Sequence, residues 1–192
     1  YRIMPPYENT PEETLEALGS MGMEIAPDFI DNECLTRFTD KAIEWMQGKE
    51  ESAKSGKPFL GICLGLQILF ESSEESPGVQ GLLIFQGSIS KMNFNKNNLK
   101  VPHMGWNKVF LKNKHPLFNN IPNESYFYFV HSYFVVPKMI DNVLATTEYD
   151  GEFCSVLHSN NVVGTQFHPE KSGATGLLIY KNFIELIENS NL

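Results

Sequence analysis

The chain of 192 residues is long enough for one domain with a substantial hydrophobic core. Its content of 42% hydrophobic and 20% charged residues is that of a folded globular protein and excludes an intrinsically disordered one. The net charge of −8 argues against a nucleic-acid-binding surface, and no apolar stretch is long enough to span a membrane.

Three cysteines, Cys34, Cys63 and Cys154, lie far apart and lack the CxxC spacing of metal sites. An odd number of scattered cysteines is also atypical of a disulfide framework. This usage predicts a protein of the reducing cytoplasm.

Residues 1–55 have the weakest pattern of the chain. Thr10-Pro11-Glu12-Glu13 predicts the start of a helix, with Thr as the cap and Pro in the first turn. Apolar residues in 32–54 follow helical spacing and predict an amphipathic helix packed on a sheet.

The apolar run Pro58–Ile62 leads to Cys63, which has a glycine two residues away on each side, at Gly61 and Gly65. This pattern predicts a nucleophile elbow, a sharp strand-to-helix turn that holds its central residue in strained dihedral angles. Side chains at both flanking positions would collide, so we expect glycine to be required at each. The following helix N-terminus would favour a thiolate. The alternative from the same residues is a buried structural cysteine in a core strand.

The middle of the chain predicts several strands and turns. Residues 81–92 have strand character, whereas Val101–Asn107 is too irregular for a plain strand. Residues 126–136 are so rich in aromatic and β-branched side chains that one mostly buried strand is expected. Further strands are expected at 143–147, 153–157 and 162–167, with turns at Asp150-Gly151 and Asn160-Asn161.

The last predicted element is a helix over residues 176–187, and the residues expected on its inward face are Leu177, Leu178, Tyr180, Phe183, Ile184 and Ile187. These elements predict an α/β fold. We expect a single domain over residues 1–192, with a central mixed, largely parallel sheet flanked by helices.

A thiolate nucleophile needs a base within reach, and the base needs an orienting partner. His168 lies just past a buried strand, and a carboxylate, Glu170, follows two residues later. Because the ends of strands meet at one edge of an open α/β sheet, we expect Cys63 and His168 to meet there. The other histidines are interpreted as solvated (His115 and His158) or structural (His103 and His131).

Glu170 could hold the His168 imidazole as the carboxylate does in a Ser-His-Asp triad. A metal site built from Cys63, His168 and Glu170 is an alternative, although the sequence offers no fourth soft ligand.

Four motifs covering residues 57 to about 187 resemble the class I (triad) glutamine amidotransferases, if Lys171-Ser172-Gly173 is counted with the motif that it directly follows. Gly61-Ile62-Cys63-Leu64-Gly65-Leu66-Gln67 and, about one hundred residues later, Gln166-Phe167-His168-Pro169-Glu170 carry the likeness to the whole family. One branch, the glutaminase subunit of imidazole glycerol phosphate synthase, is similar in three further stretches: Pro102-His103-Met104-Gly105-Trp106-Asn107, Tyr128-Phe129-Val130-His131-Ser132-Tyr133 and Lys171-Ser172-Gly173.

The resemblance implies an amidotransferase fold with a flavodoxin-like core and a triad of Cys63, His168 and Glu170. Cys63 would attack the side-chain amide carbon of glutamine, His168 would protonate the departing ammonia, and Glu170 would orient His168. The residues implied to bind glutamine are Gly61, Leu64, Gln67, His131, Ser132 and Tyr133. No cofactor and no metal ion are implied.

The resemblance also implies a partner, a (β/α)8-barrel cyclase subunit in a heterodimer. It would use the ammonia to make imidazole glycerol phosphate and an aminoimidazole carboxamide ribotide in histidine biosynthesis. Residues 104–107 and Tyr133 would face this partner. Neither a nucleic acid nor a membrane is implied as a partner.

Residues 1–55 are atypical for the family, because they lack the Pro-Gly-x-Gly loop that supplies oxyanion donors beside the nucleophile. Met4–Tyr7 and Leu18–Gly22 are the two candidates for its place, and Pro6 has no N–H to donate. Two alternatives therefore stay open: a catalytically impaired, amidotransferase-like docking subunit, and a thiol hydrolase or protease built on the same elbow.

Overall fold

The structure is a computed structural model, and it describes residues 56–93 and 99–189. The helices predicted in residues 1–55, Cys34 and both candidate oxyanion loops lie outside the described residues. The prediction of a single domain over residues 1–192 includes these positions and stays a prediction.

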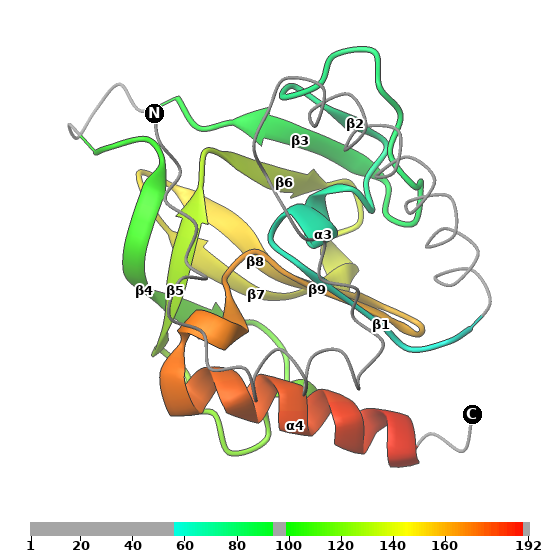
Figure 1. The fold of residues 1–192 in the computed structure, drawn as a ribbon, viewed down its shortest axis with the longest axis vertical. Coiled ribbons are helices and arrows are strands. Elements are labelled where there is room, and N and C mark those ends of the chain that lie inside the picture. The colour runs from blue at the N-terminus through cyan, green and yellow to red at the C-terminus, as the bar shows by residue number, and fades with distance from the viewer. Residues whose placement is uncertain (1–55, 94–98, 190–192) are drawn as a thin grey trace, which may run out of the picture. The chain divides into compact units, whose positions relative to one another are not determined.

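The described chain consists mainly of strands and ends in one long helix (Figure 1). The elements up to residue 111 are β1 (Phe59–Ile62), α3 (Leu64–Gln67), β2 (Ser72–Ser73), β3 (Gly87–Lys91) and β4 (His103–Leu111). The later strands are β5 (Ser125–His131), β6 (Tyr133–Pro137), β7 (Val143–Glu148), β8 (Glu152–Ser159) and β9 (Val162–Thr165). Three 3-10 turns, η1 (Pro116–Phe118), η2 (Ile140–Asn142) and η3 (Pro169–Lys171), precede the helix α4 (Gly173–Asn189).

Six strands form the larger sheet in the order β1-β9-β8-β7-β4-β5, and β2, β3 and β6 form a second sheet. The predicted mixed character is confirmed, but "largely parallel" is wrong for the described strands. Within the larger sheet as described, only β1 and β9 pair in parallel. The turns at 150–151 and 160–161 are the reason, because connections this short can join only antiparallel strands.

Three strand predictions need correction. Of residues 81–92, only β3 is a strand. Val101–Asn107 is irregular only in its first two residues, since β4 pairs with β5 continuously from His103 opposite His131 to Val109 opposite Ser125. Residues 126–136 form two strands rather than one, because the chain passes from β5 in the larger sheet to β6 in the smaller one at Ser132.

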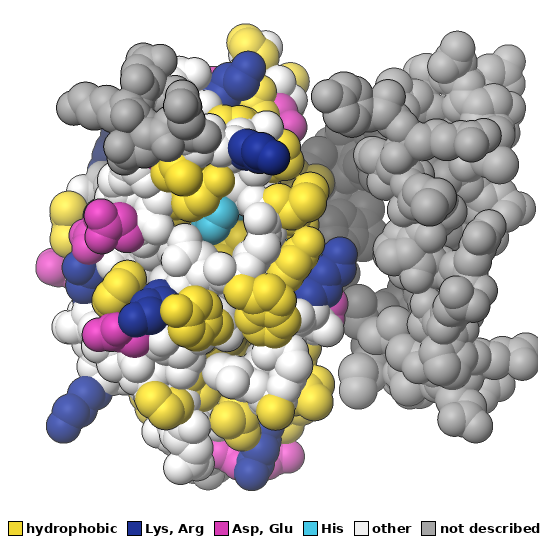
Figure 2. All heavy atoms as spheres, turned by 90° about the vertical axis from the view of Figure 1, so that its left-hand side faces the viewer, with side chains coloured by type: hydrophobic (Ala, Val, Ile, Leu, Met, Phe, Trp, Pro, Cys, Tyr) yellow, Lys and Arg dark blue, Asp and Glu magenta, His cyan; other side chains and the backbone are white. Residues whose placement is uncertain are grey.

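Strands β4 and β5 have one buried and one exposed face. Side chains alternate along a strand, so the register places Met104 and Trp106 on the same side as Tyr126 and Tyr128. Figure 2 shows hydrophobic side chains gathered on the outer side of these strands, between charged groups. The opposite face is buried and carries His103, Val109, Phe127, Phe129 and His131. The buried face therefore includes two histidines among its apolar side chains, and the exposed face includes large apolar side chains.

The hydrophobic core includes Phe127, Phe129 and Phe167 of the sheet side together with Ile179 of α4. The predicted C-terminal helix is confirmed, and its inward face is predicted correctly only in part. Leu178 and Phe183 pack against the core as expected. Ile179 is fully buried, whereas Leu177 and Ile184 are 64% and 49% exposed. Apolar residues occur around much of this helix, so periodicity alone could not select the packed side. In residues 56–93 and 99–189, no helix has the length and apolarity needed to cross a membrane.

Two substitutions in α4 test which face is packed. Ile179→Ala is expected to lower the free energy of unfolding by about 2–5 kcal/mol, because it removes a fully buried side chain and leaves a cavity. Leu177→Ala, on the exposed side of the same helix, is expected to change it by less than about 1 kcal/mol. Urea denaturation followed by circular dichroism measures both, and equal losses would contradict the assigned face.

Candidate active site

Cys63 lies at the sharp turn between β1 and α3. Its φ of 52° and ψ of −104° lie in a region that non-glycine residues rarely adopt, which confirms the predicted strained turn. Its N–H continues the sheet by donating to Thr165 O at 2.7 Å, and its carbonyl accepts the first helical bond, from the Leu66 N–H at 3.1 Å. The sulfur therefore lies at the carboxyl end of β1, ahead of the first turn of α3.

Two glycines let α3 approach the sheet below this turn. Gly61 and Gly164 lie opposite each other on β1 and β9. A Cβ on Gly61 would lie 2.6 Å from Gly65 O, and one on Gly164 would lie 2.3 Å from Leu66 Cδ1. The requirement predicted for Gly61 is confirmed. The same requirement at Gly65 is wrong within the described structure, where a Cβ on Gly65 would meet no atom within 4 Å.

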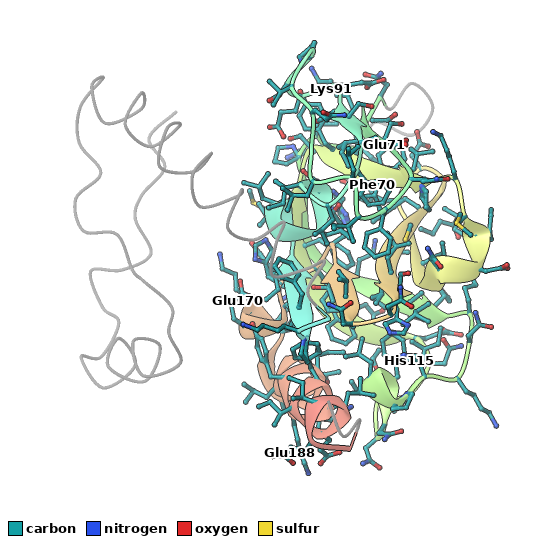
Figure 3. The ribbon with its side chains drawn as sticks, turned by 90° about the vertical axis from the view of Figure 1, so that its right-hand side faces the viewer. Phe70, Glu71, Lys91, His115, Glu170 and Glu188 are labelled. Atoms are coloured by element: carbon teal, nitrogen blue, oxygen red, sulfur yellow. The ribbon has the colours of Figure 1, made fainter. Side chains whose placement is uncertain are left out.

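His168 and Glu170 form a close pair at η3, where Figure 3 labels Glu170. His168 Nδ1 lies 2.6 Å from Glu170 Oε1. The His168 N–H donates to Tyr128 O at 2.9 Å, and Ser172 Oγ donates to His168 O at 2.6 Å, so the backbone around the ring is held on both sides. His168 Nε2 is buried and has no hydrogen-bond partner among the described residues. One ring nitrogen is thus anchored, and the other is left for a reaction.

The pKa of His168 is raised to about 9. Burial by itself would lower this pKa, but the Cys63 sulfur and the Glu170 carboxylate together outweigh burial. Burial likewise would raise the pKa of Glu170, and its hydrogen bond with His168 brings that pKa below the usual value. The structure therefore brings Cys63, His168 and Glu170 together, and it favours an imidazolium beside the sulfur at neutral pH.

Two further groups lie close to the Cys63 sulfur. Sγ is 3.8 Å from Val130 O and 3.7 Å from Gln166 Nε2. Gln166 is fully buried. Sequence reasoning did not assign it a role, although its position two residues before His168 puts it at the end of the same strand.

Several residues predicted to bind glutamine contact one another. Gln67 Nε2 donates to Tyr133 O at 2.9 Å and to Gln166 Oε1 at 3.2 Å. His131 Nδ1 lies 2.8 Å from the same Tyr133 carbonyl. Leu64 is 60% exposed beside the nucleophile. The polar atoms of Gln67 and His131 named here are therefore engaged within the protein, while the surface at Leu64 is open.

His103 and His131 form a buried pair, as expected for structural histidines. His103 Nδ1 lies 3.1 Å from His131 Nε2, and Asn107 Nδ2 lies 3.2 Å from His103 Nε2. Burial lowers the pKa of each histidine to about 4, so both are neutral at pH 7. Asn107 was expected only as a partner-facing residue, and its contact with His103 could not be found before the β4–β5 register was known.

No group of three His, Cys, Asp or Glu side chains in the described residues is arranged to hold a metal ion. Cys154 is buried, which raises the pKa of its thiol well above the usual value.

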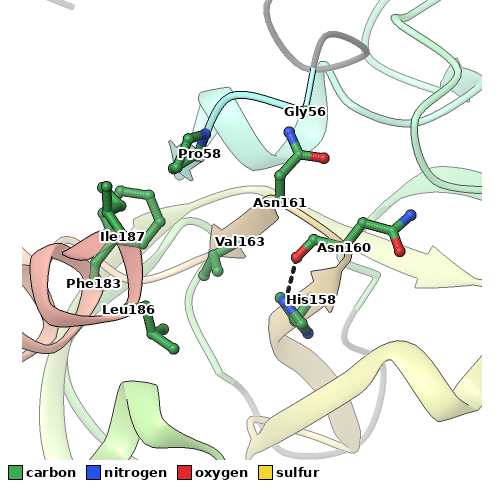
Figure 4. Close-up of a pocket in the computed structure, with 9 residues that line it drawn as sticks. All are labelled: Gly56, Pro58, His158, Asn160, Asn161, Val163, Phe183, Leu186 and Ile187. Carbon is green, nitrogen blue, oxygen red and sulfur yellow. Dashed lines mark hydrogen bonds between the residues drawn. The ribbon is translucent and has the colours of Figure 1, made fainter. Parts of the chain in front are cut away.

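A hollow of about 380 Å³ lies by the amino end of β1, opposite the end that carries Cys63 (Figure 4). Its lining is mainly apolar and includes Pro58, Val163 and Phe183, so it offers none of the chemistry found at Cys63.

Residues 37–186 match the family model for class I glutamine amidotransferases. The chain is 48% identical over 185 residues to the imidazole glycerol phosphate synthase subunit HisH of Methanosarcina mazei, covering 95% of this chain and 86% of that protein. It is 51% identical over 137 residues to the HisH subunit of Pyrococcus furiosus, covering 71% of this chain and 69% of that protein.

Two solved structures show the fold. A crystal structure of a glutamine amidotransferase covers 92% of this chain and 93% of its own, with a TM-score of 0.58 and 17% identity. A glutamine amidotransferase from Thermotoga maritima covers 93% of this chain and 79% of its own, with a TM-score of 0.52 and 16% identity. At such identities these likenesses support the fold and carry no statement about substrate.

Substitution of the two glycines beside Cys63 tests the close approach of α3. Gly61→Ala is expected to lower the free energy of unfolding by about 1–3 kcal/mol or more, because the new methyl group meets backbone atoms that cannot move away alone. Gly65→Ala is expected to be neutral or stabilising, since it adds a helix-favouring methyl group in open space. Thermal and urea unfolding of both variants measure the difference, and an equally harmful Gly65→Ala would refute it.

The raised pKa of His168 predicts its titration in solution. Below pH 9 the ring is expected to be an imidazolium, so its NMR signals should move with a midpoint near 9. Cys63→Ala should lower that midpoint, because the sulfur no longer favours the charged ring. His103 and His131 serve as internal references, which stay neutral until about pH 4. An unchanged His168 midpoint in Cys63→Ala would show that the Cys63 sulfur does not raise the pKa of His168.

Proposed function

This chain belongs to the class I glutamine amidotransferase family, in the branch of HisH glutaminase subunits, and we propose that it hydrolyses glutamine at Cys63. The ammonia is supplied for imidazole glycerol phosphate synthesis in histidine biosynthesis. The observation that carries the proposal is the buried Nε2 of His168, which lies beside the Cys63 sulfur and has no hydrogen-bond partner among the described residues, while Nδ1 is held by Glu170.

In the first half of the reaction, the Cys63 thiolate attacks the side-chain amide carbon of glutamine. His168 starts as the imidazolium that its raised pKa favours, and its Nε2–H protonates the departing nitrogen to give ammonia. The product is a glutamyl thioester on Cys63 and a neutral His168. Glu170 stays ionised and keeps the ring in the orientation that presents Nε2.

In the second half, neutral His168 takes a proton from water, and the resulting hydroxide attacks the thioester carbon. Glutamate leaves, and the Cys63 thiolate and the His168 imidazolium are restored. The N–H of Leu64 lies at the start of α3 beside the sulfur, where it can donate to the oxyanion in both halves. Gly61, Gln67, His131, Ser132 and Tyr133 shape the glutamine site in this proposal, with Gln67 and His131 acting through the carbonyl of Tyr133.

The relatives are named as subunits of a synthase, and this chain accordingly has a partner subunit. We propose that the partner is a (β/α)8-barrel cyclase, bound on the exposed face of β4 and β5. Met104, Trp106 and Tyr126 are 62%, 56% and 54% exposed on this face. The face borders the catalytic loop, because Tyr128 O accepts the His168 N–H, and Lys171 Nζ lies 6.0 Å from the Tyr128 ring centre. Ammonia released at Cys63 would thus form near the proposed contact.

Since an unpaired, reactive thiol needs a reducing compartment, the cytoplasm is the proposed site of action.

Cys63→Ser and His168→Ala test the proposed chemistry. Each is expected to lower glutamate release from glutamine by at least about a hundredfold, because the proposed nucleophile or the proposed acid is removed. Binding of the partner is expected to be retained. Release is measured with and without the cyclase, and ammonium-dependent synthesis by the complex is the control. No turnover by the unsubstituted chain under either condition would favour the docking-subunit alternative, and cleavage of general peptides would favour the protease alternative.

Trp106→Ala tests the proposed docking face. Truncation of a central aromatic side chain is expected to weaken cyclase binding by about thirtyfold. The matched control is Ile140→Ala on η2, which removes a side chain that is 77% exposed but lies outside this face. Isothermal titration calorimetry measures both affinities. Equal affinities would place the partner elsewhere.

A further inference from the structure

A buried series of hydrogen bonds connects Asn107 with the Tyr133 carbonyl, and its direction is fixed at one end. An amide nitrogen can only donate, so His103 Nε2 must accept from Asn107 Nδ2 at 3.2 Å. The proton of neutral His103 is therefore on Nδ1, which donates to His131 Nε2 at 3.1 Å. His131 must then carry its own proton on Nδ1, which donates to Tyr133 O at 2.8 Å.

The same carbonyl connects these histidines with the nucleophile. Tyr133 O also accepts a hydrogen from Gln67 Nε2 at 2.9 Å, and the second hydrogen of that nitrogen goes to Gln166 Oε1 at 3.2 Å. A reversed Gln166 amide would place two donors against each other, so its oxygen must face Gln67. Its nitrogen consequently faces the Cys63 sulfur at 3.7 Å. No other orientation satisfies both contacts.

The members of this series are shielded from water. Gln166, His103, His131 and Gln67 are 0%, 3%, 6% and 8% exposed. In such surroundings a broken hydrogen bond leaves an unsatisfied polar group at the full cost of desolvation, so the arrangement is held strongly. An N–H donor beside a sulfur also favours the anionic form, since hydrogen bonds to charged groups are stronger than those to neutral ones.

We propose that Gln166 is a further catalytic residue, which donates its side-chain N–H to the Cys63 thiolate. The Tyr133 carbonyl can only accept, so it orients the Gln67 amide, and Gln67 in turn orients Gln166. The series from Asn107 through His103 and His131 holds that carbonyl in place. Asn107, His103, His131 and Gln67 are positioning residues in this scheme. The inference rests on the proposed role of Cys63 as the nucleophile.

The scheme requires both histidines to be neutral. An additional proton on either ring would place N–H against N–H between His103 and His131, or against the Asn107 amide. Burial lowers the pKa of both rings to about 4, and the nearby His168 opposes a charge on His131. Tyr149, stacked on His103 with ring centres 3.9 Å apart, is the other ionisable neighbour in contact with the pair. The series is therefore intact at neutral pH.

The tautomers give a direct test on the unsubstituted chain. Long-range ¹H–¹⁵N NMR at pH 7 is expected to show His103 and His131 as neutral Nδ1–H tautomers. An Nε2–H tautomer or an imidazolium at either residue would overturn the series.

The contact with sulfur is tested by alkylation of Cys63 with iodoacetamide across pH, without glutamine or partner. In Gln166→Leu the midpoint of the pH–rate profile is expected to rise, and the rate on the limb below the midpoint is expected to fall about tenfold. Gln166→Glu, which has nearly the same shape, should show a larger effect because it adds negative charge. The matched control is Thr147→Val, which removes a fully buried hydroxyl that has no described partner and should leave the profile unchanged.

Asn107→Asp tests the series from its far end. The carboxylate keeps the acceptor for the Lys108 N–H at 2.7 Å, but it loses the donor to Glu148 O and must accept from His103 Nε2. Both tautomers are then reversed, and His131 Nδ1 becomes an acceptor that faces the Tyr133 carbonyl and displaces it. The pH–rate midpoint is expected to rise as in Gln166→Leu, although Asn107 does not touch Cys63. Thermal unfolding confirms that each variant is folded.

Unchanged pH–rate profiles in both folded Gln166 variants would overturn the role of Gln166. If the midpoint shifts in the Gln166 variants but not in Asn107→Asp, the positioning series is overturned. Failure of the proposed function is distinguishable, because it appears as full glutaminase turnover in Cys63→Ser and does not depend on these profiles.

Discussion

The close approach of α3 to the sheet at Gly61 and Gly164 is the constraint on which the rest of the site depends. These two glycines lie opposite each other on parallel strands, and Leu66 of α3 packs against the second. A side chain at Gly61 would collide with the backbone of α3 and push the helix outward, and one at Gly164 would displace the Leu66 side chain. Because the chain must turn from β1 into α3 within one residue, the strain falls on Cys63, whose sulfur is thereby raised from the sheet. Backbone geometry, rather than any contact of the thiol, sets the position of the Cys63 sulfur, the proposed nucleophile.

Around that fixed sulfur, the structure combines two kinds of histidine. His168 is partly buried beside the Cys63 sulfur and a carboxylate, and the pair of interactions favours its charged form. His103 and His131 are buried among aromatic rings and face each other, so burial favours their neutral forms. The same residue type is thus charged in one place and neutral in another, and the difference comes from the neighbouring charges.

Strand β4 connects these features with the surface. Its buried side contributes His103 and Asn107, and its exposed side contributes Met104 and Trp106. Any displacement of the strand by a bound partner would act on both sides at once. The pairing of β4 with β5 sets one register. That register places these apolar residues on the exposed face and these polar residues on the buried face.

The sequence by itself determined the residues of the candidate site, which are a cysteine at a glycine-flanked turn and a histidine followed by a carboxylate. It could do so because the local backbone restricts which residues can occupy those positions. It also located most of the strands and the C-terminal helix, since turn residues and apolar runs are local properties. It did not determine the packed side of α4, where Leu177 was expected inward and Ile179 is buried, because apolar residues occur on several sides. Nor did it reveal the antiparallel majority of the described sheet, the regularity of β4 or the contact of Gln166 with Cys63. Those features depend on which strands pair and in which register, and only the tertiary structure decides that, because pairing joins residues whose separation along the chain carries no local pattern.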